Sequence, residues 1–449
     1  MSTTFLLACL VIAIVLILVV IIKFKINPAI ALVLGALLLG VLAKIPVIDT
    51  VNAINSGFGN MLGSIGFPIG FGIILGQLVS DCGGANVIAQ RLVRLFPASK
   101  AIYAVAIAAF VLSIPVFFDV TFVILIPIGV ALMKQINKGI AYIVGAIAIG
   151  AGVAHTLVPP TPNPLAAADI FGFDLGIMIA GGTIIGLCMV LVAVTVYCKV
   201  LDRGLWKTDT DESGAGLQLS DTTMPENAPS VGVALIPVLL PVVLILINTV
   251  ADTMLETTPV LITFLGTKTI ALLAGALSAY VIAVRTLGSK GAQASAEESL
   301  KSAGIVFLIT GAGGSFAQVI SASGVNNAIV EMVSSVPGGV AGALLVAYFL
   351  GLAMRQITGS GTVASLTTMT IMASVSSTIG CHPLFLALAC LDGALFGATI
   401  NDSGFWIVTN MCGLNLTGGV KTYTLGQAIA SVIGIIIIIP AALLTSMFL

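Results

Sequence analysis

PVFFDVT, residues 115–121, is a polar and helix-breaking interruption inside a long apolar run. Between Ala101 and Ala131, Asp119 is the only charged residue. An ionisable side chain at membrane depth is costly to bury, so it is usually retained for a substrate, a proton or a partner. The stretch therefore predicts a break in a membrane helix and a functional role for Asp119.

The two apolar segments beside this stretch are too short to cross a bilayer. Residues 101–114 would form a helix of about 21 Å, whereas the hydrocarbon core is ~30 Å thick. Residues 121–135 are similarly short. The pattern favours a re-entrant hairpin, in which two half-length helices enter the membrane and return from a tip at Asp119. A single kinked span is the alternative.

The composition of the chain sets its class. Of its 449 residues, 59% are apolar and 8% are charged, and the mean hydropathy is +1.20. Long apolar runs predict an all-α polytopic membrane protein, because backbone groups in lipid must be satisfied within each segment. The net charge of −1 argues against a nucleic-acid partner. The seven cysteines form no CxxC pair and no Cys/His cluster, so we expect no metal site and no cofactor.

Polar and apolar segments divide the chain into three regions. We predict an N-terminal membrane repeat at residues 1–200, a solvated cytoplasmic linker at 201–230 and a C-terminal inverted membrane repeat at 231–449. The first apolar segment has no basic residue before it and no clear cleavage site after it, so we interpret it as a retained span and not a signal peptide. The expected spans are residues 4–22, 28–47, 62–80, a hairpin at 101–135, an interrupted span at 140–175, 177–200, 231–250, 268–284, 305–321, a second hairpin at 339–377, a second interrupted span at 383–410, and 424–449.

The two halves resemble each other at a fixed offset of 241 residues. Seven identities fall within 19 ungapped positions from Gly70 to Ile88 and their counterparts from Gly311 to Ile329, and they include Gln, Ser and Asn as well as Gly. An internal duplication explains these matches better than composition does. For the matched Gln77 and Gln318 we prefer a role in helix packing. The offset places the second hairpin tip at RQITGSGT, residues 355–362.

Basic residues predict the orientation. If the N-terminus starts in the periplasm, nearly all basic residues reach the cytoplasmic side, with Lys44 and Lys268 as the exceptions. Each half then crosses the membrane five times, so the two repeats run in opposite senses. Inverted repeats with interrupted helices near the middle of the membrane are typical of secondary transporters.

Four breaks in the apolar sequence carry the candidate site. They are the two hairpin tips and the interruptions at residues 155–164 (HTLVPPTPNP) and 399–405 (TINDSGF). A helix that starts at a break exposes unpaired amides and a positive dipole end, which favour an anion. The candidate substrate-binding residues at the breaks are Thr121, Thr161, Asn163, Arg355, Thr358, Ser360, Thr362, Asn401 and Ser403.

Several of these residues have structural alternatives. Arg355 could hold a substrate carboxylate through two parallel hydrogen bonds, or it could form a structural pair with Asp119 or Asp402. Asn401, Asp402 and Ser403 could cap the helix that follows them.

Asp119, His155 and Asp402 are the candidates for proton coupling. Desolvation can bring a carboxyl into the working pH range, and a histidine can relay a proton. The alternatives are a satisfied hydrogen bond at the hairpin tip for Asp119, and a buried neutral imidazole bonded to backbone carbonyls for His155. Asp169 and Asp392 receive no role from the sequence.

At these four breaks the chain resembles the gluconate permease (GntP) family of bacterial proton symporters. The matching segments, which run in order along nearly the whole chain, are IKFKINPAIALVLGALLLGV, GFGIILGQLVSDCGGANVIA, FFDVTFVILIP, HTLVPPTPNP, TGSGTVA and NDSGFW. The resemblance implies an inner-membrane carrier of sugar acids or related hydroxy acids. It also implies an elevator-type architecture, in which a domain with two hairpins slides against a scaffold.

The chain departs from the family pattern in its presumed pocket. By this matching, Asp119 replaces a common Glu, Thr161 a His and Asn163 a Gly, which implies a smaller or differently hydroxylated acid than gluconate.

The sequence therefore predicts proton-coupled uptake of a small hydroxylated organic anion across the bacterial inner membrane, by a homo-oligomer of two or three chains. Sodium coupling is the main alternative, because opened carbonyls and Ser, Thr and Asn oxygens also suit Na⁺. An anion channel and a membrane-embedded enzyme are further alternatives. No zinc or nucleophile motif supports the enzyme.

Overall fold

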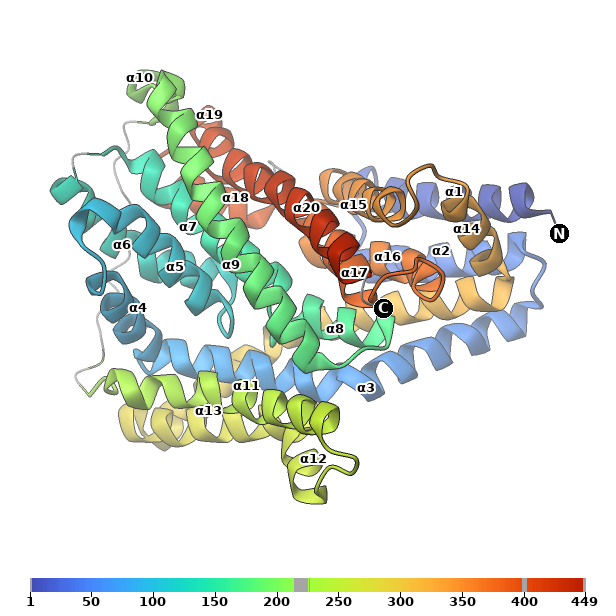
Figure 1. Cartoon of the computed structure of the whole chain (residues 1–449), viewed down its shortest axis with the longest axis horizontal. Coiled ribbons are helices and arrows are strands. Elements are labelled where there is room, and N and C mark those ends of the chain that lie inside the picture. The colour runs from blue at the N-terminus through green and yellow to red at the C-terminus, as the bar shows by residue number, and fades with distance from the viewer. Residues whose placement is uncertain (1, 137, 214–224, 226, 398–401, 447–449) are drawn as a thin grey trace.

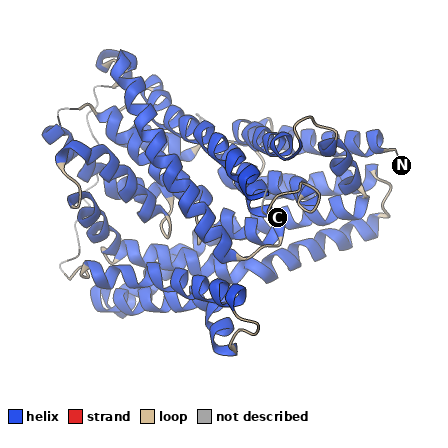
Figure 2. Ribbon diagram, viewed as in Figure 1, coloured by secondary structure: helices blue, strands red, loops and turns tan. Residues whose placement is uncertain are grey.

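The fold is described from a computed structural model, which defines residues 2–136, 138–213, 225, 227–397 and 402–446. The named elements in these residues are all helical (Figure 2). Eight of the described helices are long and apolar enough to cross a membrane. This agrees with the predicted all-helical, polytopic class.

The described residues of the first half form nine α-helices, and most of these coincide with predicted spans. Their breaks fall where prolines and polar residues interrupt the apolar sequence, since proline lacks an amide donor and its ring clashes with the preceding turn. The helices are α1 (Thr3–Ile22), α2 (Pro28–Leu42), α3 (Val47–Asp81), α4 (Gly84–Arg94), α5 (Ala101–Ser113), α6 (Phe118–Ile136), α7 (Ile140–Leu157), α8 (Pro162–Phe171) and α9 (Leu175–Val200), with short turns η1 (Ala98–Lys100) and η2 (Leu201–Leu205).

The second half of the chain follows a short linker helix. Its elements are α10 (Thr208–Asp211), α11 (Val231–Met254), α12 (Val260–Gly266), α13 (Lys268–Ser323), α14 (Val325–Ser334), α15 (Gly339–Thr358), α16 (Gly361–Met372), η3 (Ala373–Val375), α17 (Pro383–Leu395), α18 (Ser403–Met411), α19 (Leu416–Gly419), η4 (Val420–Thr424) and α20 (Leu425–Ser446).

Helix boundaries repeat at the offset that the sequence identities predict. The starts of α4, α8 and α9 lie 241 residues before the starts of α14, α18 and α19. Gly83 and Gly324, which precede α4 and α14, both have left-handed backbones, with φ of 78° and 74°. Glycine adopts this conformation without steric cost, so both positions favour it.

Two long helices, α3 and α13, pack against each other and against α11 (Figure 1). A Cβ built on Gly57 of α3 would lie 2.4 Å from the carbonyl oxygen of Gly314 in α13, and one on Gly314 would lie 2.5 Å from the carbonyl oxygen of Gly57. The two backbones therefore touch directly at this crossing, and neither position has room for a side chain.

The remaining helices pack around the two hairpins. Helix α5 contacts α7, α15 contacts α17, and α9 packs against both α7 and α20. Figure 1 shows α4, α5 and α6 on the opposite side of the molecule from α1 and α2, with α3 extending between the two groups. The core is therefore shared by both halves of the sequence.

The structure differs from the expected spans in three places. Helix α3 has 35 residues and starts well before residue 62. Element α13 consists of two helices that meet at a kink at Gly288, as the two expected spans require, but the second helix starts well before residue 305. The amphipathic helices α4 and α14 were not predicted, because a search for long apolar segments passes over short helices with one polar face.

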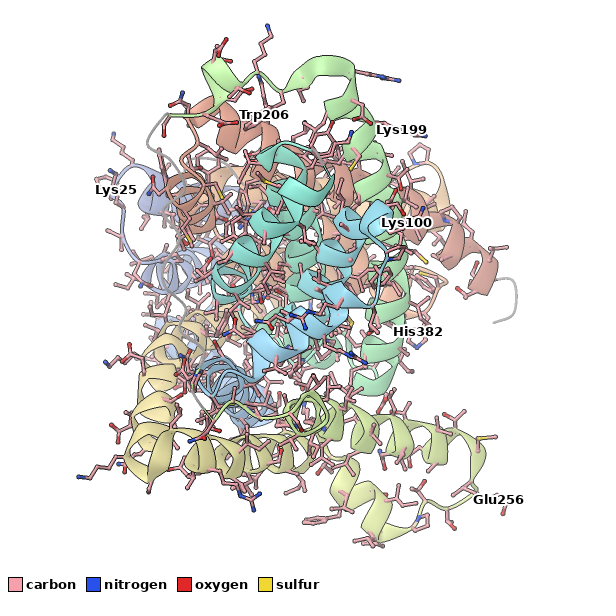
Figure 3. All side chains as sticks on the ribbon, turned by 90° about the vertical axis from the view of Figure 1, so that its left-hand side faces the viewer. Lys25, Lys100, Lys199, Trp206, Glu256 and His382 are labelled. Carbon is pink, nitrogen blue, oxygen red and sulfur yellow. The ribbon has the colours of Figure 1, made fainter. Side chains whose placement is uncertain are left out.

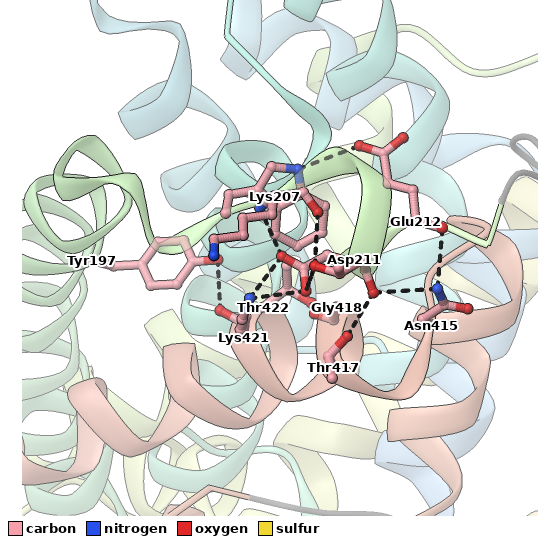
Figure 4. A network of polar contacts seen from close by, with 11 residues as sticks. Tyr197, Lys207, Asp211, Glu212, Asn415, Thr417, Gly418, Lys421 and Thr422 are labelled. Atoms are coloured by element: carbon pink, nitrogen blue, oxygen red, sulfur yellow. Dashed lines mark hydrogen bonds and ion pairs between the residues drawn. The ribbon is translucent and has the colours of Figure 1, made fainter.

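The linker is not wholly solvated, contrary to expectation. Asp211 of α10 is fully buried and accepts hydrogen bonds of 2.8 and 2.9 Å from Lys421 Nζ in η4 (Figure 4). Asn415 and Thr417 donate to backbone carbonyls of this linker segment. The described part of the linker is thus bound by hydrogen bonds to α19, to η4 and to Asn415 just before α19.

Candidate functional site

The four predicted breaks meet at one cavity of about 250 Å³. Each break contributes the start of a helix of at least nine residues, namely α6, α8, α16 and α18. The lining residues from the first turns of these helices are Phe118, Asp119, Asn163, Gly361, Thr362, Ser403 and Gly404. Because a helix start carries unpaired amides and a partial positive charge, the four starts together favour a bound anion.

Arg355 and Asp402 form a buried ion pair at the edge of this cavity. Arg355 Nη2 lies 2.5 Å from Asp402 Oδ2, and the two side chains are 8% and 11% exposed. Arg355 Nη1 also donates to the carbonyl of Gly359 at 3.2 Å, and Asp402 Oδ1 accepts from the amide of Gly404 at 2.6 Å. Arg355 therefore has the structural partner considered from the sequence, and Asp402 also caps α18.

Asp119 has a different environment from Asp402, although both line the cavity. It is half-buried, and no hydrogen bond to its carboxylate is present within the described part of the chain. The satisfied tip hydrogen bond, which was the alternative for this residue, is therefore not formed by the described residues. Asp119 is available to bind a proton or a ligand.

His155 lines the cavity from the end of α7. Its ring lies 5.6 Å from the ring of Phe117, centroid to centroid. Its Nδ1 is buried and has no hydrogen-bond partner among the described residues. A buried imidazole bonded to backbone carbonyls through this nitrogen, which was the alternative for His155, is not observed.

Buried polar atoms without partners gather at this cavity. A buried polar group that lacks a hydrogen bond costs about 1–3 kcal/mol, so such a cluster favours a polar ligand. Within the described residues, the unpartnered atoms on cavity-lining side chains are His155 Nδ1, Asn163 Oδ1, Arg355 Nε and Gln427 Oε1.

The structure does not bring every predicted binding residue to the cavity. Thr121 is buried nearby but does not line it, and the Thr161 hydroxyl donates to the carbonyl of Val158 at 2.8 Å. Thr358 donates to Met354 O at 2.8 Å, and Ser360 accepts from the amide of Val363 at 3.4 Å. These last hydroxyls cap helix ends. Asn401 lies outside the described residues.

Three polar lining residues, Thr156, Tyr423 and Gln427, were missed by the sequence analysis. Gln427 is a polar residue within the mostly apolar C-terminal span, so the sequence alone could have indicated it. Tyr423 packs its ring 5.4 Å from that of Phe118 and 6.3 Å from that of Phe405. It lies in the π-helical turn η4, for which the sequence offered no comparable signal.

A second polar cluster joins α8 and α9 to α3, α11 and α13. Asp169 accepts hydrogen bonds from Ser64 and, at 2.8 Å, from Lys268, while Asp174 accepts from Thr249 at 2.5 Å. A cavity of about 330 Å³ lies beside it, lined in part by Asp169, Asp174 and Lys268. Asp169, unassigned from the sequence, is therefore an ion-pair residue.

Metal binding has no support in the described residues, where no group of three or more His, Cys, Asp or Glu side chains could hold an ion.

Comparison with known proteins gives consistent matches. Residues 5–444 match the model of the GntP family permease. The chain is 32% identical over 434 residues to the high-affinity gluconate transporter of Escherichia coli, covering 95% of this chain and 96% of that one. It is 30% identical over 440 residues to the D-serine transporter DsdX of Escherichia coli, covering 97% of each chain.

Among solved structures, MtrF of Neisseria gonorrhoeae, described with a class of antimetabolite efflux pumps, has a similar fold. The TM-score is 0.64 at 14% sequence identity, over 88% of this chain and 83% of that one. At this identity the similarity concerns the fold alone.

Proposed function

The chain belongs to the GntP family of permeases, and we propose that it carries a small hydroxylated organic acid across the bacterial inner membrane in symport with protons. The observation that carries this proposal is the meeting of four helix starts at one polar cavity. Gluconate and D-serine, named for two relatives, share a carboxylate and at least one hydroxyl group. Helix amides suit the carboxylate, and the unpartnered side-chain atoms suit the hydroxyls.

In this mechanism Asp119 binds the coupled proton. The cavity holds two carboxylates, Asp119 and Asp402, and one cation, Arg355, which Asp402 already neutralises. An ionised Asp119 would therefore repel an incoming anion. A proton on Asp119 removes that repulsion, so proton binding and substrate binding favour each other.

The substrate contacts follow from the residues that line the cavity. We assign substrate binding to Asn163, Thr362 and Ser403, with Arg355 contributing its free Nε–H. His155, which lines the same cavity, would exchange protons with it. Four other predicted binding residues do not line the cavity, and their hydroxyls would reach a substrate only after the structure rearranges. They are Thr121, Thr161, Thr358 and Ser360.

For the transport cycle we propose two inverted repeats and an elevator-type movement. The repeated helix boundaries support the duplication, and the odd number of crossings expected in each half supports the inversion. Movement of the helices that hold the cavity past α3, α11 and α13 would require the contacts of Asp169 and Asp174 to break.

We place the N-terminus in the periplasm, because this orientation puts nearly all basic residues in the cytoplasm. In Figure 3, Lys199 and Trp206 lie toward the upper end of the structure and the acidic Glu256 lies at the lower corner. The linker would then be cytoplasmic and the loop after α11 periplasmic.

Uptake by purified protein in liposomes tests the proposal. With gluconate, D-serine and related hydroxy acids as probes, an inward proton gradient should drive accumulation of at least one of them. Asp119→Asn should abolish accumulation while leaving exchange of labelled for unlabelled substrate. Asp209→Asn, which changes an exposed linker acid, is the matched control and should accumulate normally. Uptake that follows a sodium gradient and ignores pH would overturn proton coupling, and wild-type accumulation by Asp119→Asn would remove Asp119 from it.

A further inference from the structure

A second acidic residue, Asp392, is buried in the helical core outside the cavity described above. It lies in α17, is 0% exposed, and neither carboxylate oxygen has a hydrogen-bond partner of normal geometry among the described residues. The amide of Ile435 is the one backbone donor close enough to act on its charge. An ionised carboxylate in such a place would be strongly destabilising, since neither water nor a partner compensates its charge.

The surroundings of Asp392 fit its carboxyl group closely. Gly434 of α20 faces it, and a Cβ built on that glycine would lie 2.4 Å from Asp392 Oδ1 and 2.5 Å from the terminal methyl of Met189 in α9. The carboxyl group therefore occupies space that a side chain at position 434 would fill.

No cation faces Asp392 from the described helices packed around it. Tyr348 of α15 is the titratable group that acts on it, and α16 and α20 carry no titratable side chain. Several ionisable groups on these helices have partners elsewhere: His155 of α7 lines the cavity, Tyr142 of α7 bonds to Asp202, Asp169 of α8 to Lys268, Arg355 of α15 to Asp402, and Tyr197 of α9 to the carbonyls of Ala141 and Lys421. The remaining ionisable groups are Cys390 of α17 and Cys188, Cys198 and Lys199 of α9, and none of them acts on the charge of Asp392.

Two polar residues lie on the face of α20 that runs from the cavity to the backbone of Asp392. Gln427 lines the cavity, and Ser431 follows one turn later. Ser431 Oγ donates to the backbone carbonyl of Asp392 at 2.7 Å and contacts the Tyr348 hydroxyl at 3.1 Å. Hydroxyl groups both donate and accept hydrogen bonds, so these two hydroxyls can pass a proton once a side-chain rotation brings one of them to the Asp392 carboxyl.

We propose that Asp392 is a second proton-binding site, which exchanges its proton with the substrate cavity when a side-chain rotation brings the hydroxyl of Ser431 or Tyr348 to its carboxyl group. This inference rests on the proposed proton symport for its role in transport, but not for the binding of the proton itself. The proton enters as H⁺, forms the O–H bond of a neutral carboxylic acid at Asp392, and leaves by the same route. The site would add a second titrating step to the cycle that Asp119 serves.

Infrared difference spectroscopy of the purified full-length protein tests proton binding directly. A protonated carboxyl without hydrogen bonds has a C=O stretching band at high frequency, and we expect the wild type to show it at neutral pH. Asp392→Asn should remove this band, whereas Asp119→Asn and Asp209→Asn should retain it. A band of unchanged intensity in folded Asp392→Asn protein would overturn the proposal.

Two further variants keep the proposal testable if Asp392→Asn fails to fold. Ser431→Ala and Tyr348→Phe leave the carboxyl in place but remove the hydroxyls of the route, so hydrogen–deuterium exchange of the band should slow about tenfold. Exchange at the wild-type rate in both variants would overturn the route. Because the band is measured without substrate, failure of proton-driven uptake would count against the proposed function and leave the assignment of the proton site to be decided by the spectra.

Discussion

Arg355 of α15 and Asp402 at the start of α18 are joined at 2.5 Å, and this contact ties the second hairpin tip to the second interrupted span. Each partner also holds a helix end, because Arg355 donates to the carbonyl of Gly359 and Asp402 caps the amide of Gly404. The start of α18 and the end of α15, which leads into α16, therefore depend on a single ion pair.

Removing one partner of this pair should destabilise the protein strongly. Arg355→Ala leaves Asp402 as an uncompensated charge in a nearly buried position, which typically costs about 3–5 kcal/mol. We expect a lower midpoint of thermal unfolding in detergent and loss of substrate uptake. Asp402→Ala should have a similar effect through the charge of Arg355.

The double variant measures how much stability depends on the interaction between the two side chains. Arg355→Ala combined with Asp402→Ala leaves no isolated charge, so its loss of stability should be clearly smaller than the sum of the two single losses. Additive losses would show that the two side chains stabilise the protein independently.

The Lys268–Asp169 pair between α13 and α8 should contribute little to stability. Its side chains are 33% and 23% exposed, so solvent and salt screen the attraction between the two charges. We expect Lys268→Asp to lower the unfolding midpoint, and a second change, Asp169→Lys, to restore most of the loss. The coupling between the two positions should be about 1 kcal/mol and should shrink at high salt. A charge-reversed double variant no more stable than Lys268→Asp would contradict this.

The positions of most helices could be predicted from the sequence, whereas the start of the second helix within α13 could not. Residues 285–304 contain basic and acidic side chains and resemble a polar loop between two spans. They are also rich in Ala, Glu and Lys, which favour helix, and the second helix begins directly after the kink at Gly288. Helix propensity therefore extends this helix beyond its apolar segment.

Asp211 should make the linker contact sensitive to acid. Burial tends to raise the pKa of this carboxyl, but hydrogen bonds from Lys421 and from the amide of Lys207 hold it below the ordinary 3.8. A lowered pKa stabilises the folded contact at all pH values above 3.8, and the stabilisation is lost as pH falls from there through the lowered pKa. Limited proteolysis of the linker should therefore become faster only when the pH falls below 3.8.

A variant without the lysine charge provides the control for this pH dependence. Lys421→Met should be cleaved faster than the wild type at neutral pH, with a weaker dependence on acid. Equal cleavage rates in both proteins at neutral pH would show that the Asp211–Lys421 contact does not hold the linker.

The crossing of α3 and α13 should not tolerate a single methyl group. Gly57→Ala would place its Cβ 2.4 Å from the carbonyl oxygen of Gly314, so we expect a loss of about 1–3 kcal/mol in stability. Gly59→Ala is the matched control on the same helix, since its Cβ would meet no atom within 4 Å. It should be neutral or slightly stabilising, as Ala favours helix over Gly. Thermal unfolding of both variants compares them, and equal midpoints would contradict the close contact.

The candidate site was predicted in outline, because the four breaks are local features of the sequence. The partners of its residues were not, because they depend on packing between distant segments. Arg355 could have paired with Asp119 or Asp402, and only the fold selects Asp402, 47 residues away. Thr358 and Ser360 were assigned to the substrate, although hydroxyls beside a helix end commonly cap it instead.

Gly83 and Gly324 turn the chain from α3 into α4 and from α13 into α14 in the same way. The amphipathic helices that follow have 11 and 10 residues, so both hairpins are attached to the long helices by connecting arms of nearly equal reach. In the proposed elevator-type movement, arms matched in length and in pivot would let the two hairpins swing together as one unit, without stretching either connection and without pulling the four helix starts apart.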